Sequence, residues 1–462
     1  MYFLAAFAIA ACNPSGPYTR PDIPLPASYR GASGPLQVKD TTTVSSMPYS
    51  SFFNDAALRT LIDSAVVSNL DLQIALKNID YSRQSLDAAR LGNIPTLGIG
   101  ADASVSHPSD NGQNAIKTGD KNTYNFSAYA AMSWEADIWG KIRSRKKSAL
   151  ATYLGTAEAA KAVKTRLVAD VAQGYYNLLM LDEQLEVTKK SLALADTTLR
   201  MMRLQYDAGL VTSLAVQQQE AARVSVALSL PVAEQKISAQ ENALGILCGR
   251  MPGPVKRQER LFSIAVSDDL PSGIPASLLH NRPDVRAAEL AVRAAHANMN
   301  EAGASLYPSL KITAEGGVNA LRASEWFSVP GSLFSVVQGS LLQPIFQQGQ
   351  LRAKYEQSKI KRDQAVLEFR QAVLKAVGEV SDVLVQLEKL KSEELLAAQR
   401  AGVLRKAVSN AGLLFRSGMA TYLEVIVAQG NALQAELALA DIRRQHLAAM
   451  AELYRALGGG WK

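Results

Sequence analysis

The sequence predicts an α+β membrane protein in which very long helices alternate with two-faced β-strands, duplicated along the chain. Residues 124–137 alternate apolar and mostly polar side chains, as a strand with two different faces does. About 65 residues without proline follow from Lys141 to near Tyr206, which predicts one helix on the order of 100 Å long. Such a helix needs helical neighbours along its whole length. The third observation is that the same order of elements recurs.

The repeat is visible in short matching segments. Residues 206–209 (YDAG) and 415–418 (FRSG) are 209 positions apart (415 − 206). Residues 94–97 (IPTL) and 307–310 (YPSL) match at an offset of 213 (308 − 95). The offset changes between these pairs, in stretches whose sequence is typical of loops. A repeat that changes length only in a loop indicates a duplicated structural unit.

The N-terminal residues 1–12 form an apolar run that ends in small residues before Cys12. This pattern resembles a bacterial lipoprotein signal, whose cysteine carries the lipid of the mature chain. The positively charged start of such a signal is missing, so we expect the true start to lie further upstream. An ordinary signal peptide with a chance cysteine is the alternative. Asn13 follows where aspartate would retain a lipoprotein at the inner membrane, so the outer membrane is the expected destination.

The second cysteine of the chain is Cys248. With Cys12 lipidated, no disulfide is expected. We predict that Cys248 is a small buried residue at a helix end.

Residues 13–50 are predicted to form an extended tether and part of an equatorial segment. They contain many of the chain's 18 prolines, which prevent regular helix and central strand. The segment is long enough to run from a lipid anchor along the outside of the folded body.

The first repeat is assigned to residues 51–250. A helix is expected from Asn54, with Asn54 and Asp55 as cap candidates, to about Leu91. Strands near 96–106 and 124–137 form a hairpin. The long helix and a second helix follow, and Pro231 predicts a kink or break in the latter.

Residues 251–282 are assigned to an equatorial linker and residues 283–462 to the second repeat. Its expected elements are a helix over 283–306, strands near 309–319 and 333–346, a long helix over 350–415, and a final helix from Tyr422 to about Leu457. The C-terminal end returns to the equatorial region.

Four strands with one apolar and one polar face cannot lie in a membrane as an open sheet, because their edge amides would lack hydrogen-bond partners. A closed barrel of about eight or more strands therefore needs at least two chains. The strand pattern leaves two, three or four chains open.

The formal charge of +7 raises nucleic acid or acidic lipid as a partner. Charges of both signs alternate along the helices and no aromatic-basic module is present, so nucleic acid is not expected. The basic cluster 141–147 either faces lipid head groups or is a solvated helix start.

An enzyme is not expected. The four histidines, His107, His280, His296 and His446, show no metal-ligand spacing, and no phosphate loop or nucleophile motif occurs. We therefore expect no catalytic residue, metal or cofactor other than lipid on Cys12. A soluble coiled-coil scaffold would leave the signal-like start and the matched strands unexplained.

Several longer motifs carry a resemblance to a known family. They are the segments 52–62, 134–140 (WEADIWG), 281–289 (NRPDVRAAE), 343–346 (QPIF) and 349–353 (GQLRA). In this order and with the duplication, the chain resembles the TolC-like outer membrane factors, in particular their lipoprotein (OprM/NodT-like) branch. The resemblance covers nearly the whole chain from Cys12 to Trp461.

The resemblance implies a homotrimer with a 12-stranded barrel in the outer membrane, four strands per chain, and a periplasmic α-helical barrel with an equatorial collar. It implies a passive, non-catalytic exit duct of a tripartite drug efflux pump. The implied partners are outer membrane lipid, a periplasmic adaptor and an inner-membrane transporter of the RND type. A type I protein secretion system is the alternative, and copper efflux is a weaker one because the methionines are scattered. The sequence does not reveal the substrate.

The same resemblance assigns functional residues. The helix-turn-helix tips, where the adaptor docks, correspond here to Tyr206, Gly209, Thr212, Phe415, Gly418 and Thr421. The glycines suit a left-handed turn and the threonines suit a helix cap.

The pore gate is expected just after the second tip. Relatives have Leu, three residues and then Asp-Ala-Gln-Arg, whereas this chain has Leu423 and then Val427-Ala428-Gln429-Gly430. We therefore predict a gate of Leu423 and Val427 that closes by dewetting in place of an acidic ring. Glu424 is either a lumen charge or an ordinary solvated side chain.

Overall fold

The computed structural model describes residues 16–30, 47–111, 121–265 and 275–461. Cys12 lies outside these ranges. Within them, none of the helices combines the length and apolar character needed to cross a membrane.

The chain divides into two compact units, each built from segments of both repeats. The first, here called the sheet unit, includes Ile79–Gly155 and Ala288–Phe369 together with the segment up to Pro21. The second, the hairpin unit, includes Asp22–Asn78, Thr156–Ala287 and the chain from Arg370 onward.

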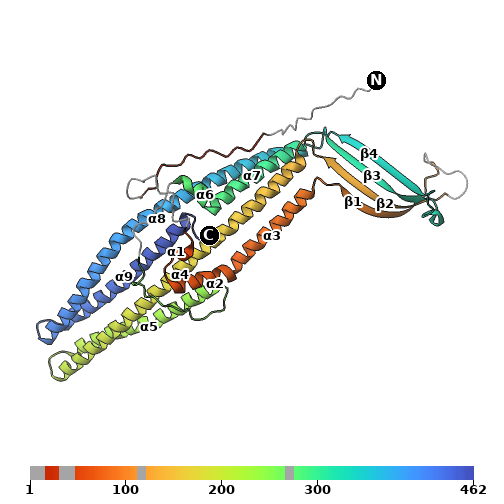
Figure 1. The fold of residues 1–462 in the computed structure, drawn as a ribbon. Coiled ribbons are helices and arrows are strands. Elements are labelled where there is room, and N and C mark those ends of the chain that lie inside the picture. The colour runs from red at the N-terminus through yellow and green to blue at the C-terminus, as the bar shows by residue number, and fades with distance from the viewer. Residues whose placement is uncertain (1–15, 31–46, 112–120, 266–274, 462) are drawn as a thin grey trace. The chain divides into compact units, whose positions relative to one another are not determined.

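One four-stranded antiparallel sheet dominates the sheet unit (Figure 1). The strands are β1 (Thr96–Ser106), β2 (Thr123–Ala136), β3 (Ser309–Ala320) and β4 (Leu333–Leu342), in that spatial order. Pairing of β2 with β3 joins the two repeats side by side. The predicted end of the last strand at 346 is wrong, because β4 stops at Leu342 and Pro344 has no N–H to donate to a ladder.

The alternation of side chains is preserved from strand to strand. Met132 of β2 lies opposite Leu97 of β1 and Ala314 of β3. Residues that are opposite one another share a face, so the apolar residues of the three strands form one continuous surface. Ser133, beside Met132, lies opposite Thr96 and Thr313 on the other face.

The helices begin and end at residues whose side chains or backbone suit those positions. Asp137 accepts hydrogen bonds from the N–H groups of Ile142 (2.8 Å) and Arg143 (2.9 Å), at the start of α4 (Lys141–Asp207). Lys141, the first residue of the basic cluster, pairs with Glu135 at 2.8 Å. An acidic group at a helix N-terminus is favourable, so strand β2 passes directly into a well-capped helix.

The predicted helix from Asn54 to Leu91 is two helices, α2 (Ala56–Ser68) and α3 (Leu70–Leu91). Asp55 caps the first, as expected. Asn69 separates them in an extended conformation, accepting a hydrogen bond from the Leu72 N–H and donating one to the Leu247 carbonyl, both at 2.9 Å. Asparagine is a good N-cap, and its tertiary partner holds it there.

Two helical hairpins, α4 with α5 (Ser213–Leu247) and α8 (Gln350–Arg416) with α9 (Tyr422–Ala456), have helices of the same lengths, as duplication predicts. Helices α4 and α8 each contain 67 residues. Helices α5 and α9 each contain 35. A break at Pro231 is wrong, because α5 continues through it. Pro231 has no N–H to donate, so it removes one backbone hydrogen bond from α5 without ending the helix.

Parts of the expected equatorial region meet in the hairpin unit around the end of α9. Tyr454 stacks on Phe52 of α1 (Tyr49–Phe52) at 4.3 Å and donates a hydrogen bond to the Met47 carbonyl at 2.7 Å. Arg282, just before α7 (Pro283–Ala304), is buried and donates to the Ala456 carbonyl at 3.0 Å.

The N-terminal stretch 16–21 is without helix or strand, as its prolines predict. It lies against α7 in the sheet unit. Arg20 pairs with Glu289 at 2.9 Å, and the Tyr18 ring packs edge-on to His296 at 5.8 Å and under Arg293 at 5.2 Å.

Candidate functional site at the helical tips

The first tip is a glycine turn between α4 and α5. Gly209 has a φ of +73°, a conformation that glycine adopts without strain. The Leu210 N–H donates to the Gln205 carbonyl at 2.8 Å, which is the long bond of a Schellman motif. Thr212 then caps α5, accepting a hydrogen bond from the Ala215 N–H at 3.3 Å. The predicted turn and cap are confirmed.

The second tip repeats this geometry between α8 and α9. Gly418 has a φ of +74°, and the Met419 N–H donates to the Leu414 carbonyl at 2.8 Å. Thr421 is the N-cap of α9, and its N–H donates to the Glu424 carboxylate at 3.0 Å. Glu424 is therefore part of a capping box, which the Thr-x-x-Glu pattern could have revealed.

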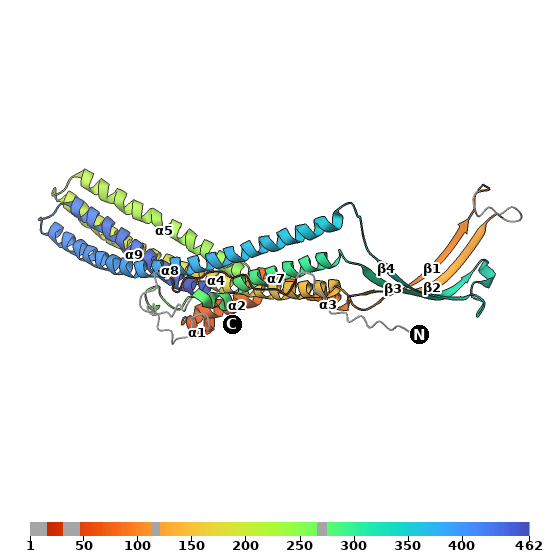
Figure 2. The same cartoon turned by 90° about the horizontal axis from the view of Figure 1, so that it is seen from above.

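A small core joins the two tips to each other. Its buried members, one from each of the four helices, are Met202, Ala215, Phe415 and Val425. The tips therefore form one packed body in the hairpin unit, and Figures 1 and 2 both show the two turns at the same end.

The same core separates the predicted tip residues by environment. The Phe415 side chain is only 6% exposed, whereas Tyr206 is 48% exposed. Phe415 therefore shapes the tip from inside, and Tyr206 belongs to its surface. Burial of Met202 likewise accounts for one of the scattered methionines by packing.

The predicted gate residues lie on the surface of α9. Leu423 is 55% exposed and Val427 is 51% exposed, while Val425 between them is buried in the tip core. Residues four apart share one face of a helix, so Leu423 and Val427 form a short apolar stripe. In a single chain the two side chains of this stripe are about half exposed.

Polar contacts fasten the hairpins behind the tips. Gln429 donates to Thr198 at 2.9 Å, and Gln219 donates to the Ala195 carbonyl at 3.2 Å. Arg405 of α8 pairs with Glu436 of α9 at 2.6 Å. These contacts join α4 to both α5 and α9, and α8 to α9. A movement of one helix at the tips relative to the others must therefore break some of them.

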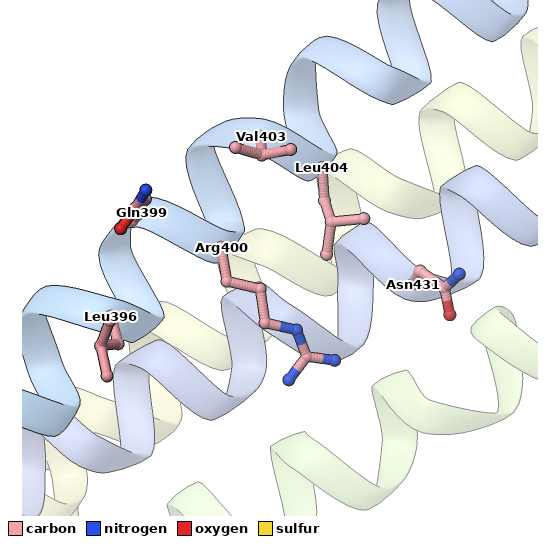
Figure 3. Close-up of a pocket in the computed structure, with 6 residues that line it drawn as sticks. All are labelled: Leu396, Gln399, Arg400, Val403, Leu404 and Asn431. Atoms are coloured by element: carbon pink, nitrogen blue, oxygen red, sulfur yellow. The ribbon is translucent and has the colours of Figure 1, made fainter.

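A shallow hollow of about 470 Å³ lies further along α8 and α9 (Figure 3). Its lining combines apolar, amide and cationic side chains from Leu396, Gln399, Arg400, Val403 and Leu404 of α8 and Asn431 of α9. Figure 3 shows the Arg400 guanidinium extending from α8 across α9. No sequence pattern pointed to this hollow.

Cys248 is at the end of α5, as predicted. It is fully buried, its thiol lies 3.6 Å from the Leu61 carbonyl, and burial raises its pKa. A buried neutral thiol of this kind is a packing residue with little reactivity.

Comparison with known proteins adds the family. The model of the family described as outer membrane efflux protein matches residues 61–250 and 274–459. The chain is 30% identical over 467 aligned positions to the probable efflux pump outer membrane protein TtgC of Pseudomonas putida, covering 99% of this chain and 94% of that protein. It is 27% identical to the cation efflux system protein CusC of Escherichia coli, over 100% of this chain and 98% of that one.

Among solved structures, the open state of the MtrE outer membrane channel of Neisseria gonorrhoeae superposes with a TM-score of 0.87. The alignment covers 98% of this chain and 99% of that one, at 24% identity. This match confirms the expected α+β fold, and the family model above confirms the expected TolC-like family. With its family model matched along both repeats, the chain belongs to the outer membrane efflux protein family.

Proposed function

We propose that three copies of this chain form the outer membrane exit duct of a tripartite efflux pump, without catalytic activity. The sheet is the observation that carries this assembly. Within the described residues β1 pairs only with β2 and β4 only with β3, so both outer edges are open. In hydrocarbon those edge groups need partners, and neighbouring copies supply them by closing a barrel.

The exposed side chains support the same assembly. Ile99 of β1 is 92% exposed and Val337 of β4 is 78% exposed. Leu367 and Leu374 of α8 are also more than half exposed. A soluble single chain rarely displays so many large apolar groups, whereas lipid and neighbouring copies cover them in the proposed trimer.

The route through the duct follows from the tips. The two glycine turns are proposed to receive a periplasmic adaptor, which links the duct to an inner-membrane transporter of the RND type. Leu423 and Val427 are proposed to line the closed end, where apolar residues exclude water until the tips separate. Efflux is preferred to type I protein secretion because the named relatives above are efflux components.

Lipidation of Cys12, which lies outside the described residues, is proposed to anchor the chain. Metabolic labelling with a palmitate analogue, followed by mass analysis of the N-terminal fragment, tests this. Cys12→Ser should abolish labelling, and Cys248→Ser should leave it intact. Labelling that survives Cys12→Ser would contradict the assignment.

Two measurements test the proposed function. Native mass analysis of the detergent-solubilised protein should give three chains. Two or four chains would overturn the trimer, and a single chain would overturn the barrel closure. Accumulation of a fluorescent lipophilic dye should rise when the gene is deleted and fall when it is restored. If dye accumulation is unchanged while proteins disappear from the medium, protein secretion replaces efflux as the function.

A further inference from the structure

The connection between β3 and β4 is a compact loop at the end of the sheet away from α7 and α8 (Figure 1). The Asn319 N–H donates to the Ser332 carbonyl at 2.8 Å, and the Ser332 hydroxyl donates to the Glu325 carbonyl at 2.6 Å. These bonds close the loop on itself. It therefore presents its side chains in a defined arrangement.

Two adjacent aromatic residues of this loop contact the sheet. The Trp326 ring lies 5.5 Å from the ring of Phe126 in β2, and it stacks on Phe327 at 5.0 Å. Offset ring pairs at these separations are favourable by about 1 kcal/mol beyond the area they bury. The contact with Phe126 fixes which face of the sheet the loop approaches.

That face is the apolar one. Phe126 is directly opposite Ala320 of β3 and shares its face with Met132 and Trp134 further along β2. The other face of the sheet carries Ser127 of β2 and its cross-strand partner Asn319 of β3. The loop is thus fastened to the side of the sheet that would meet lipid.

The loop also exposes large apolar side chains. Phe327 is 69% exposed and Val329 is 65% exposed, while Arg322 and Glu325 form a charged pair beside them at 3.7 Å. An apolar surface next to charged groups and an aromatic ring is typical of the membrane–water boundary.

The spacing along β2 fits the thickness of a membrane. Phe126 and Trp134 are eight residues apart on one face, or about 26 Å along the strand. The apolar band of an outer membrane barrel is about 25 Å tall, with aromatic residues at both boundaries. Trp134, whose indole N–H donates to the Asn93 carbonyl at 3.0 Å, is at the helical end of the strand. The loop with Trp326 is at the other end.

We infer that the β3–β4 loop anchors the outer rim of the sheet in the membrane boundary, with acyl chains of the outer leaflet as its partner. Trp326 holds the loop against Phe126, and Phe327 and Val329 enter the lipid. This inference rests on the proposed function, since it requires the sheet to span the outer membrane. It adds a lipid-binding surface outside the strands themselves.

Tryptophan fluorescence in vesicles of brominated phosphatidylcholine tests the inference, because bromine quenches only nearby rings. Replacing three of the four tryptophans by phenylalanine gives full-length variants that keep Trp326, Trp134 or Trp461 alone. Bromine near the head groups should quench Trp326 and Trp134 strongly and leave Trp461, in the hairpin unit, unquenched.

The outcomes separate the two proposals. Quenching of Trp134 without quenching of Trp326 would overturn the loop anchor and leave the spanning sheet intact. Absence of quenching at both positions would contradict the proposal that the sheet spans the membrane, and with it the proposed function.

A substitution provides a second measurement. In the variant that keeps Trp326 alone, Phe327→Ser should reduce the quenching by shallow bromine, and Phe327→Leu should preserve it. Phe262→Ser, at a 44% exposed position in the hairpin unit, is the matched control and should change nothing. Unchanged quenching in Phe327→Ser would show that Phe327 has no part in the anchor.

Discussion

Gln429 of α9 donates a hydrogen bond from its side-chain amide to the hydroxyl of Thr198 in α4, over 2.9 Å. The bond connects the second hairpin to the first, just behind Leu423 and Val427 on α9. Thr198 is only 2% exposed and also donates to the Leu194 carbonyl at 3.0 Å. The contact thus holds α9 against α4 close to the proposed gate.

We propose that the bond between Gln429 and Thr198 belongs to the closed state of the gate, so Gln429→Leu is expected to make that state less stable. A hydrogen bond of this kind contributes about 1 kcal/mol, so its loss should shift the closed–open equilibrium by about fivefold. Higher basal conductance in planar bilayers is the expected result. Thr198→Val should have a similar effect, and the double variant should add little. Additive effects would show that the two residues act separately.

The apolar stripe gives a second prediction. Leu423→Ser or Val427→Ser should raise the single-channel conductance, because a hydroxyl lets water wet a constriction that apolar side chains keep dry. Leu214→Ser is the matched control, since Leu214 is the counterpart of Leu423 in the first repeat and is equally exposed at 56%. Conductance unchanged by both α9 substitutions would remove the stripe from the gate.

The long helices could be predicted almost to the residue. Proline-free, helix-favouring sequence indicated α4 and α8, and glycine in a left-handed turn ends both. The strands followed from alternation, with β1 over Thr96–Ser106 as expected. Helix-favouring composition and side-chain alternation both depend on residues that are close in sequence, so they can be recognised in a single sequence.

Features that depend on distant partners were missed. Asn69 interrupts the predicted first helix by bonding to Leu247, which is 178 residues away. Phe415 was assigned to the tip, yet its side chain is buried against residues of the other hairpin. Neither partner could be identified from the local pattern. The docking and gate assignments themselves stay predictions.

The glycine turn offers a test of tip geometry. Gly418→Ala places a β-carbon at φ +74°, where nothing lies within 4 Å of it, so the cost is backbone strain of about 1 kcal/mol. The tip should distort while the trimer remains assembled. Weaker binding of the purified adaptor, measured by surface plasmon resonance, is expected.

Gly412→Ala is the control for this substitution. Gly412 lies inside α8 and a β-carbon there also meets nothing within 4 Å. Alanine is more favourable than glycine inside a helix by about 1 kcal/mol. This change should therefore stabilise α8 and leave the binding of the adaptor unchanged. Equal loss of binding in both variants would show that the left-handed turn is not what the adaptor recognises.

The acid sensitivity of the hairpin unit should depend partly on the pair of Arg282 and Asp284. The two side chains are 2.6 Å apart. Desolvation acts to raise the pKa of Asp284, but the hydrogen bond and charge of Arg282 outweigh it and leave the pKa below its ordinary value of 3.8. A carboxyl whose pKa is lowered by folding stabilises the fold above its unfolded pKa, and that contribution is lost as pH falls through the folded pKa.

Asp284→Asn should therefore lower the urea midpoint of unfolding at neutral pH, and the difference from wild type should shrink below about pH 4. Asp207→Asn is the control, because Asp207 is exposed at the first tip and ends α4. If the difference in urea midpoint between Asp284→Asn and wild type stays constant from neutral to acid pH, the charge of Asp284 does not contribute to the stability of the fold. The Arg282 side chain, 4% exposed and also 2.8 Å from Glu379, would then be held mainly by its other partners.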